Sequence, residues 1–271
     1  MSFSPTEACF EGFRVTRNRP GAIALWALVW LAGLIAAGLV TIPFVAPFMD
    51  EILQARGGPP SPEVQAAIRM ASYASMPITL LIQAILMPAV YRSVLRPEQK
   101  AFGSLRIGKA EGLVLVVIAG IALVSTLLQL ASETLQPIVT EAAGALAWFV
   151  PGFLIFLFSI WFGVQTSLLA PATFAGAKIR LKAPFALARL HFWPLLGMMV
   201  LSIVMAMLVV LLVAMVAAPL YFLMMQAGTE PSVLALVASV VMILLVPLAL
   251  ALATTIIWAP FAAAWRGIGE S

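Results

Sequence analysis

Six long intervals without a charged residue divide the chain, and they constrain its fold more than any other feature. A transmembrane helix needs about 20 mainly apolar residues to cross the hydrocarbon core of a bilayer. Every interval reaches that length; the intervals are 20–49, 70–91, 112–132, 142–177, 190–229 and 231–265. We therefore predict an all-α membrane protein with six transmembrane helices, near residues 22–45, 70–91, 113–131, 148–170, 193–218 and 232–261.

The composition agrees with a chain that lies in lipid. Of the 271 residues, 63% are hydrophobic and 10% are charged, whereas soluble domains carry about 25% charged residues. So few charges cannot cover a water-exposed surface, which excludes a soluble enzyme, a DNA-binding domain and a disordered chain. The interval 190–229 could hold two spans with a turn near Pro219, but the distribution of charge favours one.

Basic residues predict the orientation in the membrane. With six spans, thirteen of the 15 Lys and Arg residues fall on the side of both termini, and only Arg56 and Arg69 fall on the other. The positive-inside rule then places both termini in the cytoplasm, and we expect a bacterial inner-membrane protein. The first apolar run is longer than that of a cleavable signal peptide, so it is expected to remain as a span. Topology explains the net charge of +4, and no nucleic-acid partner is expected.

Short patterns recur three times along the chain. A phenylalanine precedes an arginine by four residues before the first, third and fifth spans, and a proline lies near the end of each even span. We predict three parallel repeats (1–97, 98–180 and 181–271), each an amphipathic segment followed by a helical hairpin, related by an axis along the membrane normal. The alternative is chance, because such patterns are short. The residues are Phe10/Arg14, Phe102/Arg106, Phe185/Arg189 and Pro88, Pro171, Pro260.

Two basic segments, 99–111 and 178–191, precede the third and fifth spans. Short basic amphipathic segments of this kind lie in the lipid headgroup layer. Arg14, Arg106 and Arg189 are therefore candidate contacts for lipid headgroups. The simpler interpretation is that these arginines only set the topology.

The sequence offers little for catalysis. One cysteine, Cys9, and one histidine, His191, exclude an internal disulfide and a Cys/His metal cluster. No ionisable residue lies at the middle of a span, whereas proton relays and ion-coupled transporters place such groups there. An intramembrane hydrolase also needs a base beside its nucleophile. We predict no catalytic residue, no bound metal and no cofactor.

Neutral polar side chains remain inside the spans. Gln83, Thr166 and Thr255 each lie five residues before a repeat proline, so the repeat would place them at one depth around a polar cavity. The alternative is that they form hydrogen bonds between helices. Other such residues are Ser125, Thr126, Gln129, Ser159, Gln165, Ser202, Ser239 and Thr254.

Two stretches, 87–113 (MPAVYRSVLRPEQKAFGSLRIGKAEGL) and 170–197 (APATFAGAKIRLKAPFALARLHFWPLLG), carry a resemblance to a known group. A proline-ended helix, a basic loop and a Phe-Trp helix entry resemble six-span inner-membrane proteins of bacteria. These include YciC-like proteins and the membrane domain fused to some glycerophosphodiester phosphodiesterases. The phosphodiesterase catalytic domain is absent from this chain, so the resemblance implies a membrane fold and no enzymatic activity.

Three functional classes follow from these observations. The favoured one is a non-catalytic membrane protein that binds lipids or partner proteins in envelope assembly, with membrane lipids and an unidentified membrane protein as partners. The alternative is a small transporter or facilitator with a neutral polar cavity. An intramembrane enzyme is the least favoured class, because the sequence offers no set of acid, base or metal ligands.

Overall fold

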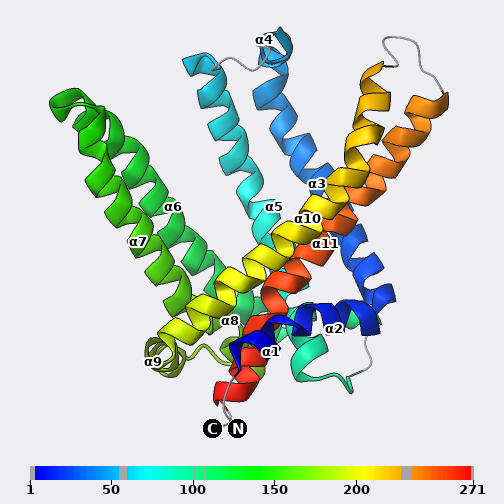
Figure 1. Ribbon diagram of the computed structural model, residues 1–271, viewed down its shortest axis with the longest axis vertical. Helices are drawn as coiled ribbons and strands as arrows, with labels where there is room; N and C mark the ends of the chain where they lie inside the picture. The colour runs from blue at the N-terminus through cyan, green and yellow to red at the C-terminus, as the bar shows by residue number, and fades with distance from the viewer. Residues whose placement is uncertain (1–3, 55–59, 100–101, 107, 227–232, 270–271) are drawn as a thin grey trace.

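The computed structural model describes residues 4–54, 60–99, 102–106, 108–226 and 233–269. These residues form helices and no β-strand, and six of the helices are long and apolar enough to cross a membrane. The predicted fold class is therefore confirmed, and the chain is a multi-pass membrane protein (Figure 1).

The long helices form three hairpins in chain order. These are α3 (Pro20–Val45) with α5 (Pro62–Leu95), α6 (Lys109–Ala143) with α7 (Phe149–Thr166), and α10 (Phe192–Gln226) with α11 (Val233–Gly269). Shorter helices connect or precede them: α1 (Pro5–Cys9), α2 (Glu11–Asn18), η1 (Ala46–Phe48), α4 (Met49–Gln54), η2 (Phe102–Ser104), η3 (Ala145–Trp148), α8 (Leu169–Gly176) and α9 (Lys182–Leu190).

Local sequence signals explain where several helices begin. Pro20 occupies the first turn of α3, where its missing N–H would have no partner within the helix. Ser61 caps α5, because its hydroxyl accepts a hydrogen bond from the backbone N–H of Val64 at 3.3 Å. α6 ends before Gly144, whose φ of +85° is readily adopted by glycine.

Two spans differ from the predicted ranges. α6 continues to Ala143, beyond the predicted end at residue 131, because no helix-breaking residue precedes Pro137 and the helix absorbs that proline. The fourth predicted span, 148–170, is divided, since α7 ends at Thr166 and α8 begins at Leu169. The break lies just before Pro171, which cannot donate a backbone hydrogen bond to the preceding turn.

The helices converge at one end of the molecule and spread apart at the other (Figure 1). We call the convergent end the terminal face; it carries α1, α2, α8, α9 and the C-terminal end of α11, and we call the opposite end the distal end. The main core lies toward the terminal face, where Trp26, Tyr91 and Phe174 are its largest fully buried side chains. A second cluster joins α1 to α10 and α11 through Cys9, Met198 and Ile268.

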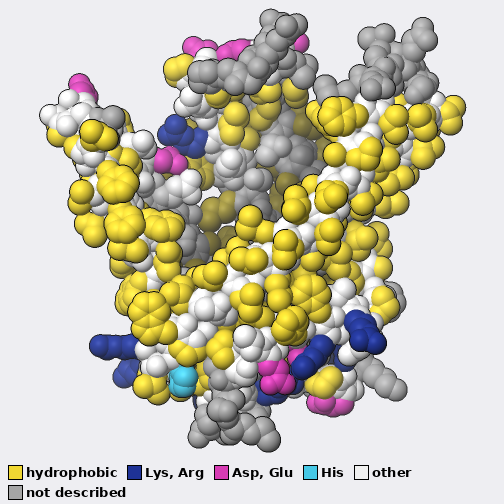
Figure 2. Space-filling view, in the orientation of Figure 1, with side chains coloured by type: hydrophobic (Ala, Val, Ile, Leu, Met, Phe, Trp, Pro, Cys, Tyr) yellow, Lys and Arg dark blue, Asp and Glu magenta, His cyan; other side chains and the backbone are white. Residues whose placement is uncertain are grey.

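Small residues let helices approach closely near this core. Ala251, Ala259, Ala262 and Ala264 of α11 are fully buried. Helix association in lipid depends on such close packing, because lipid tails solvate exposed apolar side chains as well as another helix does. Figure 2 shows the consequence: apolar side chains cover the middle of the molecule, and basic side chains gather at the terminal face.

The order of elements is compatible with three repeated units, and the repeat itself stays a prediction. A short helical segment (α2, η2 or α9) precedes each hairpin, and Pro88, Pro171 and Pro260 are all buried. The aromatic residues three positions after the first two prolines, Tyr91 and Phe174, pack against each other with ring centroids 6.2 Å apart. A rotational relation among the three units stays a prediction.

Candidate functional site

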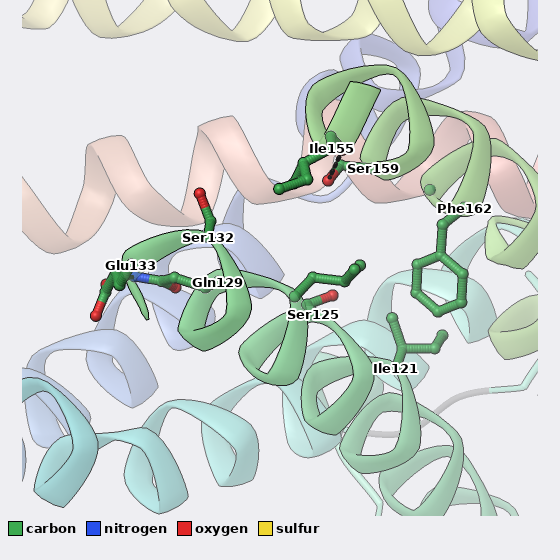
Figure 3. A pocket seen from close by; sticks show the side chains of 10 residues that line it. Ile121, Ser125, Gln129, Ser132, Glu133, Ile155, Ser159 and Phe162 are labelled. Atoms are coloured by element: carbon green, nitrogen blue, oxygen red, sulfur yellow. Dashed lines mark hydrogen bonds between the residues drawn. The ribbon is translucent and has the colours of Figure 1, made fainter. Parts of the chain in front are cut away.

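A groove with polar walls runs between α6 and α7 (Figure 3). Its volume is about 320 Å³, which is within the range of small-molecule and cofactor sites. Polar and apolar residues both line it, in the order Ile121, Ser125, Leu128, Gln129, Ser132 and Glu133 on α6 and Ile155, Ser159, Phe162 and Gly163 on α7.

Helix periodicity creates the polar wall of this groove. Ser125, Gln129, Ser132 and Glu133 are spaced at i, i+4, i+7 and i+8, so they share one face of α6. Ser159 of α7 faces this wall across the groove (Figure 3). A polar stripe on a helix that is otherwise apolar is exceptional inside a membrane, because lipid offers such groups no hydrogen bonds.

The groove changes character along its length. Glu133, Ser132 and Gln129 lie at the end toward the distal side, whereas Ile121 and Phe162 lie at the other end (Figure 3). From residue 121 to residue 133, α6 rises about 18 Å at 1.5 Å per residue. One end of the groove is therefore polar and the other apolar, over a distance similar to the thickness of one leaflet of the hydrocarbon core, about 15 Å.

Two carboxylates on α6 mark the depth of the groove in the bilayer. Glu111 and Glu133 are separated by 22 residues, which corresponds to about 33 Å of helix. The hydrocarbon core of a bilayer is about 30 Å thick. The two residues therefore fit opposite membrane boundaries, and the groove occupies the half that lies toward the distal end.

The two oxygens of Glu133 have different partners. Oε1 accepts a hydrogen bond from Nε2 of Gln129 at 3.1 Å. Oε2 is buried and forms an ion pair with Nη1 of Arg69 on α5, 3.8 Å away, but accepts no hydrogen bond from the described residues. Oε2 can therefore still accept a hydrogen bond from a donor at the distal end of the groove.

The groove closes toward the terminal face. Val117 and Ile118 of α6 and Val164 of α7 are buried just beyond its apolar end. Packed side chains therefore bound the groove on the side that faces the terminal face.

The structure places the predicted cavity residues elsewhere. Thr166 and Thr255 are buried, and each hydroxyl donates to a carbonyl of its own helix, Phe162 O at 2.8 Å and Ala251 O at 2.6 Å. Gln83 is half-buried in α5. None of these three residues lines the groove, and a separate cavity shared by them stays a prediction.

The three candidate lipid-contact arginines occupy different surroundings. Arg14 pairs with Glu11 at 3.2 Å and with Glu7 at 3.8 Å, so acidic neighbours already partner it. Arg106 and Arg189 are exposed, and Arg189 belongs to α9 of the terminal face. Their exposure is compatible with headgroup contact and equally with a role in topology.

Other arginines organise the loop that enters α6. Arg92 of α5 donates to the carbonyl of Ser104 and pairs with Glu111, and Nη1 of Arg19 donates to the Ser104 hydroxyl at 3.0 Å. The indole of Trp26 donates to the carbonyl of Gly103 at 2.8 Å. These contacts hold Ser104 at a φ of +57°, in the left-handed region that a serine rarely adopts.

Sequence reasoning identified Ser125, Gln129 and Ser159 as polar residues within spans but did not assemble them into a site. The i, i+4, i+7, i+8 spacing on α6 was the available signal. A comparison of the chain with family models, curated proteins and solved structures finds no match.

Proposed function

We propose that this membrane protein binds a lipid or a similar amphipathic molecule in the groove between α6 and α7. The observation that carries the proposal is the change from polar to apolar lining over about 18 Å of α6, from Glu133 to Ile121. A lipid has the same asymmetry, with a polar headgroup at one end and an acyl chain at the other. The headgroup would lie at Glu133 and the chain would extend toward Ile121 and Phe162.

The hydrogen-bonding capacity of Glu133 indicates which headgroups fit. Oε2 of Glu133 can accept a hydrogen bond, and the hydroxyls of Ser125 and Ser132 can donate or accept. The Ser159 hydroxyl already donates to the carbonyl of Ile155 at 2.8 Å and can only accept. A headgroup that carries a hydroxyl or an ammonium group satisfies Oε2, whereas a headgroup with only acceptors does not. We therefore favour a lipid whose headgroup donates hydrogen bonds.

The packing beyond the apolar end of the groove favours binding over transport. The buried side chains of Val117, Ile118 and Val164 lie between the groove and the terminal face. A transporter needs access to both sides in turn, so we favour a binding protein.

Substitution of Gly163 tests the proposal. A Cβ at Gly163 would meet no atom within 4 Å, so a side chain has room to begin there, and Gly163→Leu extends an apolar side chain into the groove. Gly120→Leu is a matched control, because Gly120 also faces open space but does not line the groove. Native mass spectrometry of the purified proteins should show lipid loss from Gly163→Leu and retention by Gly120→Leu. Equal retention by both variants would contradict the proposal.

The proposed location is the bacterial inner membrane, with both termini in the cytoplasm. Support comes from the excess of basic residues at the terminal face and from the resemblance to six-span inner-membrane proteins. In this orientation, the groove lies in the outer leaflet. A membrane-impermeant maleimide should label Gln136→Cys in intact cells and Ala183→Cys only after permeabilisation. The opposite pattern would reverse the assignment of leaflets.

A further inference from the structure

A second, smaller pocket lies at the terminal face, where three helices end. Its volume is about 150 Å³, and its walls are Leu95, Arg96, Ala175, Trp265, Arg266 and Gly269. α5 ends at Leu95, α8 at Gly176 and α11 at Gly269. The two arginines are 170 residues apart in the sequence, and folding brings both to one pocket.

Both guanidinium groups are held in position by one backbone carbonyl each. Nη2 of Arg96 donates to the carbonyl of Ala175 at 3.1 Å, and Nη1 of Arg266 donates to the carbonyl of Val94 at 3.1 Å. The guanidinium of Arg96 also lies over the ring of Phe174, 5.3 Å from its centroid. Each arginine has five N–H donors, so these bonds orient the groups and leave further donors available.

The charge of this pocket is positive. Among the described residues, no carboxylate lies within 4 Å of Arg96 or Arg266, whereas Arg92 nearby is neutralised by Glu111. The C-termini of three helices together carry about 1.5 units of negative charge, which is less than the charge of two guanidinium groups. The described residues of the pocket therefore carry an excess of positive charge that an anion can balance.

We propose that Arg96 and Arg266 bind a phosphate group in this pocket. Guanidinium groups bind phosphate oxygens through paired N–H donors, and two groups whose positions are fixed suit a tetrahedral anion. The pocket is smaller than typical sites for drug-sized ligands, which fits a phosphate group rather than a large organic molecule. This proposal is independent of the groove between α6 and α7.

The phosphate has two chemical sources, an anionic lipid headgroup or free phosphate in the aqueous phase. Arg96 lies one helical turn, about 6 Å, beyond Arg92 along α5. Arg92 pairs with Glu111, which marks the membrane boundary, and headgroups extend about 5–7 Å beyond that boundary. The depth of the pocket thus admits a lipid phosphate, and its position at the terminal face admits a soluble one.

Arginine-to-lysine substitutions distinguish phosphate binding by paired N–H donors from a simple attraction to positive charge. Arg96→Lys and Arg266→Lys keep the positive charge and the ability to donate to a helix C-terminus, but they lose the paired donors. Arg17→Lys is the matched control, because Arg17 of α2 is exposed on the same face and does not line the pocket. Calorimetric titration of the detergent-purified protein with inorganic phosphate, at constant ionic strength, measures the free source. Native mass spectrometry after exchange into phosphatidylglycerol or phosphatidylcholine nanodiscs measures the lipid source.

We expect Arg96→Lys and Arg266→Lys each to weaken binding by about tenfold or more, as the loss of a hydrogen bond to a charged group does. If the two substitutions weaken the binding of inorganic phosphate, the ligand is soluble. If they reduce only the retention of phosphatidylglycerol, the ligand is a lipid. Binding of both probes at the same strength by wild type, Arg96→Lys, Arg266→Lys and Arg17→Lys overturns the proposal.

A measurement on the wild-type chain keeps the test valid if a lysine variant fails to fold. Phenylglyoxal modifies accessible arginines, and mass spectrometry identifies the modified positions. Inorganic phosphate or phosphatidylglycerol should slow modification of Arg96 and Arg266 more than that of Arg17. Equal rates of protection at all three arginines also overturn the proposal.

Discussion

Arg92 of α5 and Glu111 of α6 form an ion pair whose side chains are only 4% and 10% exposed. Removal of one partner leaves a buried charge, which destabilises a protein by about 3–5 kcal/mol. We predict a loss of this size in the free energy of unfolding for Arg92→Met, measured by denaturant titration in mild detergent. The double variant Arg92→Met/Glu111→Leu should recover most of it, because neither charge then remains buried.

The second ion pair of α5 provides the control. Arg69 lies 3.8 Å from Glu133, and their side chains are 53% and 36% exposed. Exposed pairs contribute about 1 kcal/mol or less, so Arg69→Met should change the stability little. Equal losses for Arg92→Met and Arg69→Met would contradict the structural role assigned to Arg92.

The packing of α2 on α11 depends on Gly12. A Cβ at this position would lie 2.7 Å from Cα of Ile256 and 3.2 Å from the carbonyl oxygen of Thr255, and backbone atoms cannot rotate away. Gly12→Ala should lower the free energy of unfolding by about 1–3 kcal/mol, despite a gain in helix propensity of about 1 kcal/mol. Gly21→Ala, where no atom lies within 4 Å, should keep or raise the stability. A Gly12→Ala protein as stable as Gly21→Ala would contradict the docking of α2.

The thiol of Cys9 reports the docking of α1. The side chain is fully buried, and Sγ donates to the carbonyl of Met198 at 3.4 Å and lies 3.6 Å from Oγ of Ser202. Burial raises the pKa of the Cys9 thiol, and the hydrogen bond with Ser202 lowers it by less. The thiolate is the reactive form, so N-ethylmaleimide should modify Cys9 much more slowly in the folded protein than in the denatured protein at neutral pH.

The raised pKa of the Cys9 thiol also predicts how its modification rate depends on pH. Because the folded-state pKa is raised, the contribution of the neutral thiol to stability is complete below the ordinary thiol pKa and is lost as the pH rises above it. Modification of Cys9 should therefore accelerate more steeply in alkaline solution than that of an exposed thiol, for which Ser4→Cys/Cys9→Ser serves as control. Parallel pH profiles for the two thiols would show that α1 does not bury Cys9.

The spans could be predicted from the sequence because charge is excluded from the hydrocarbon core. The same reasoning missed the break before Pro171, since hydropathy does not register a missing backbone donor. The positive-inside rule also counted Arg92 only as one of the basic residues that set the orientation in the membrane. The burial of Arg92 depends on the loop at Gly103 and Ser104 folding back to α5, and a tertiary contact of this kind leaves no local pattern.

The groove was predictable only in part. The stripe from Ser125 to Glu133 follows from helix periodicity, but its pairing with Ser159 depends on how α6 and α7 pack. For the predicted cavity residues Thr166 and Thr255, the sequence contained a pattern that did not predict the hydrogen bonds of their side chains. Their shared distance from a proline was visible in the sequence, yet their hydroxyls donate to their own helices. Hydroxyl groups in apolar helices commonly make this local bond, which periodicity cannot distinguish from a cavity-facing position.

Photo-cross-linking with lipid probes tests the binding groove most directly. Two phospholipids are needed, one with a diazirine in an amine-containing headgroup and one with a diazirine at the end of an acyl chain. Mass spectrometry of the labelled protein should place the headgroup probe near Ser132 and Glu133 and the chain probe near Ile121 and Phe162, with both labels reduced in Gly163→Leu. Equal labelling of the groove and of lipid-facing residues such as Leu123 and Leu157, or the reverse orientation of the two probes, would contradict lipid binding in this groove.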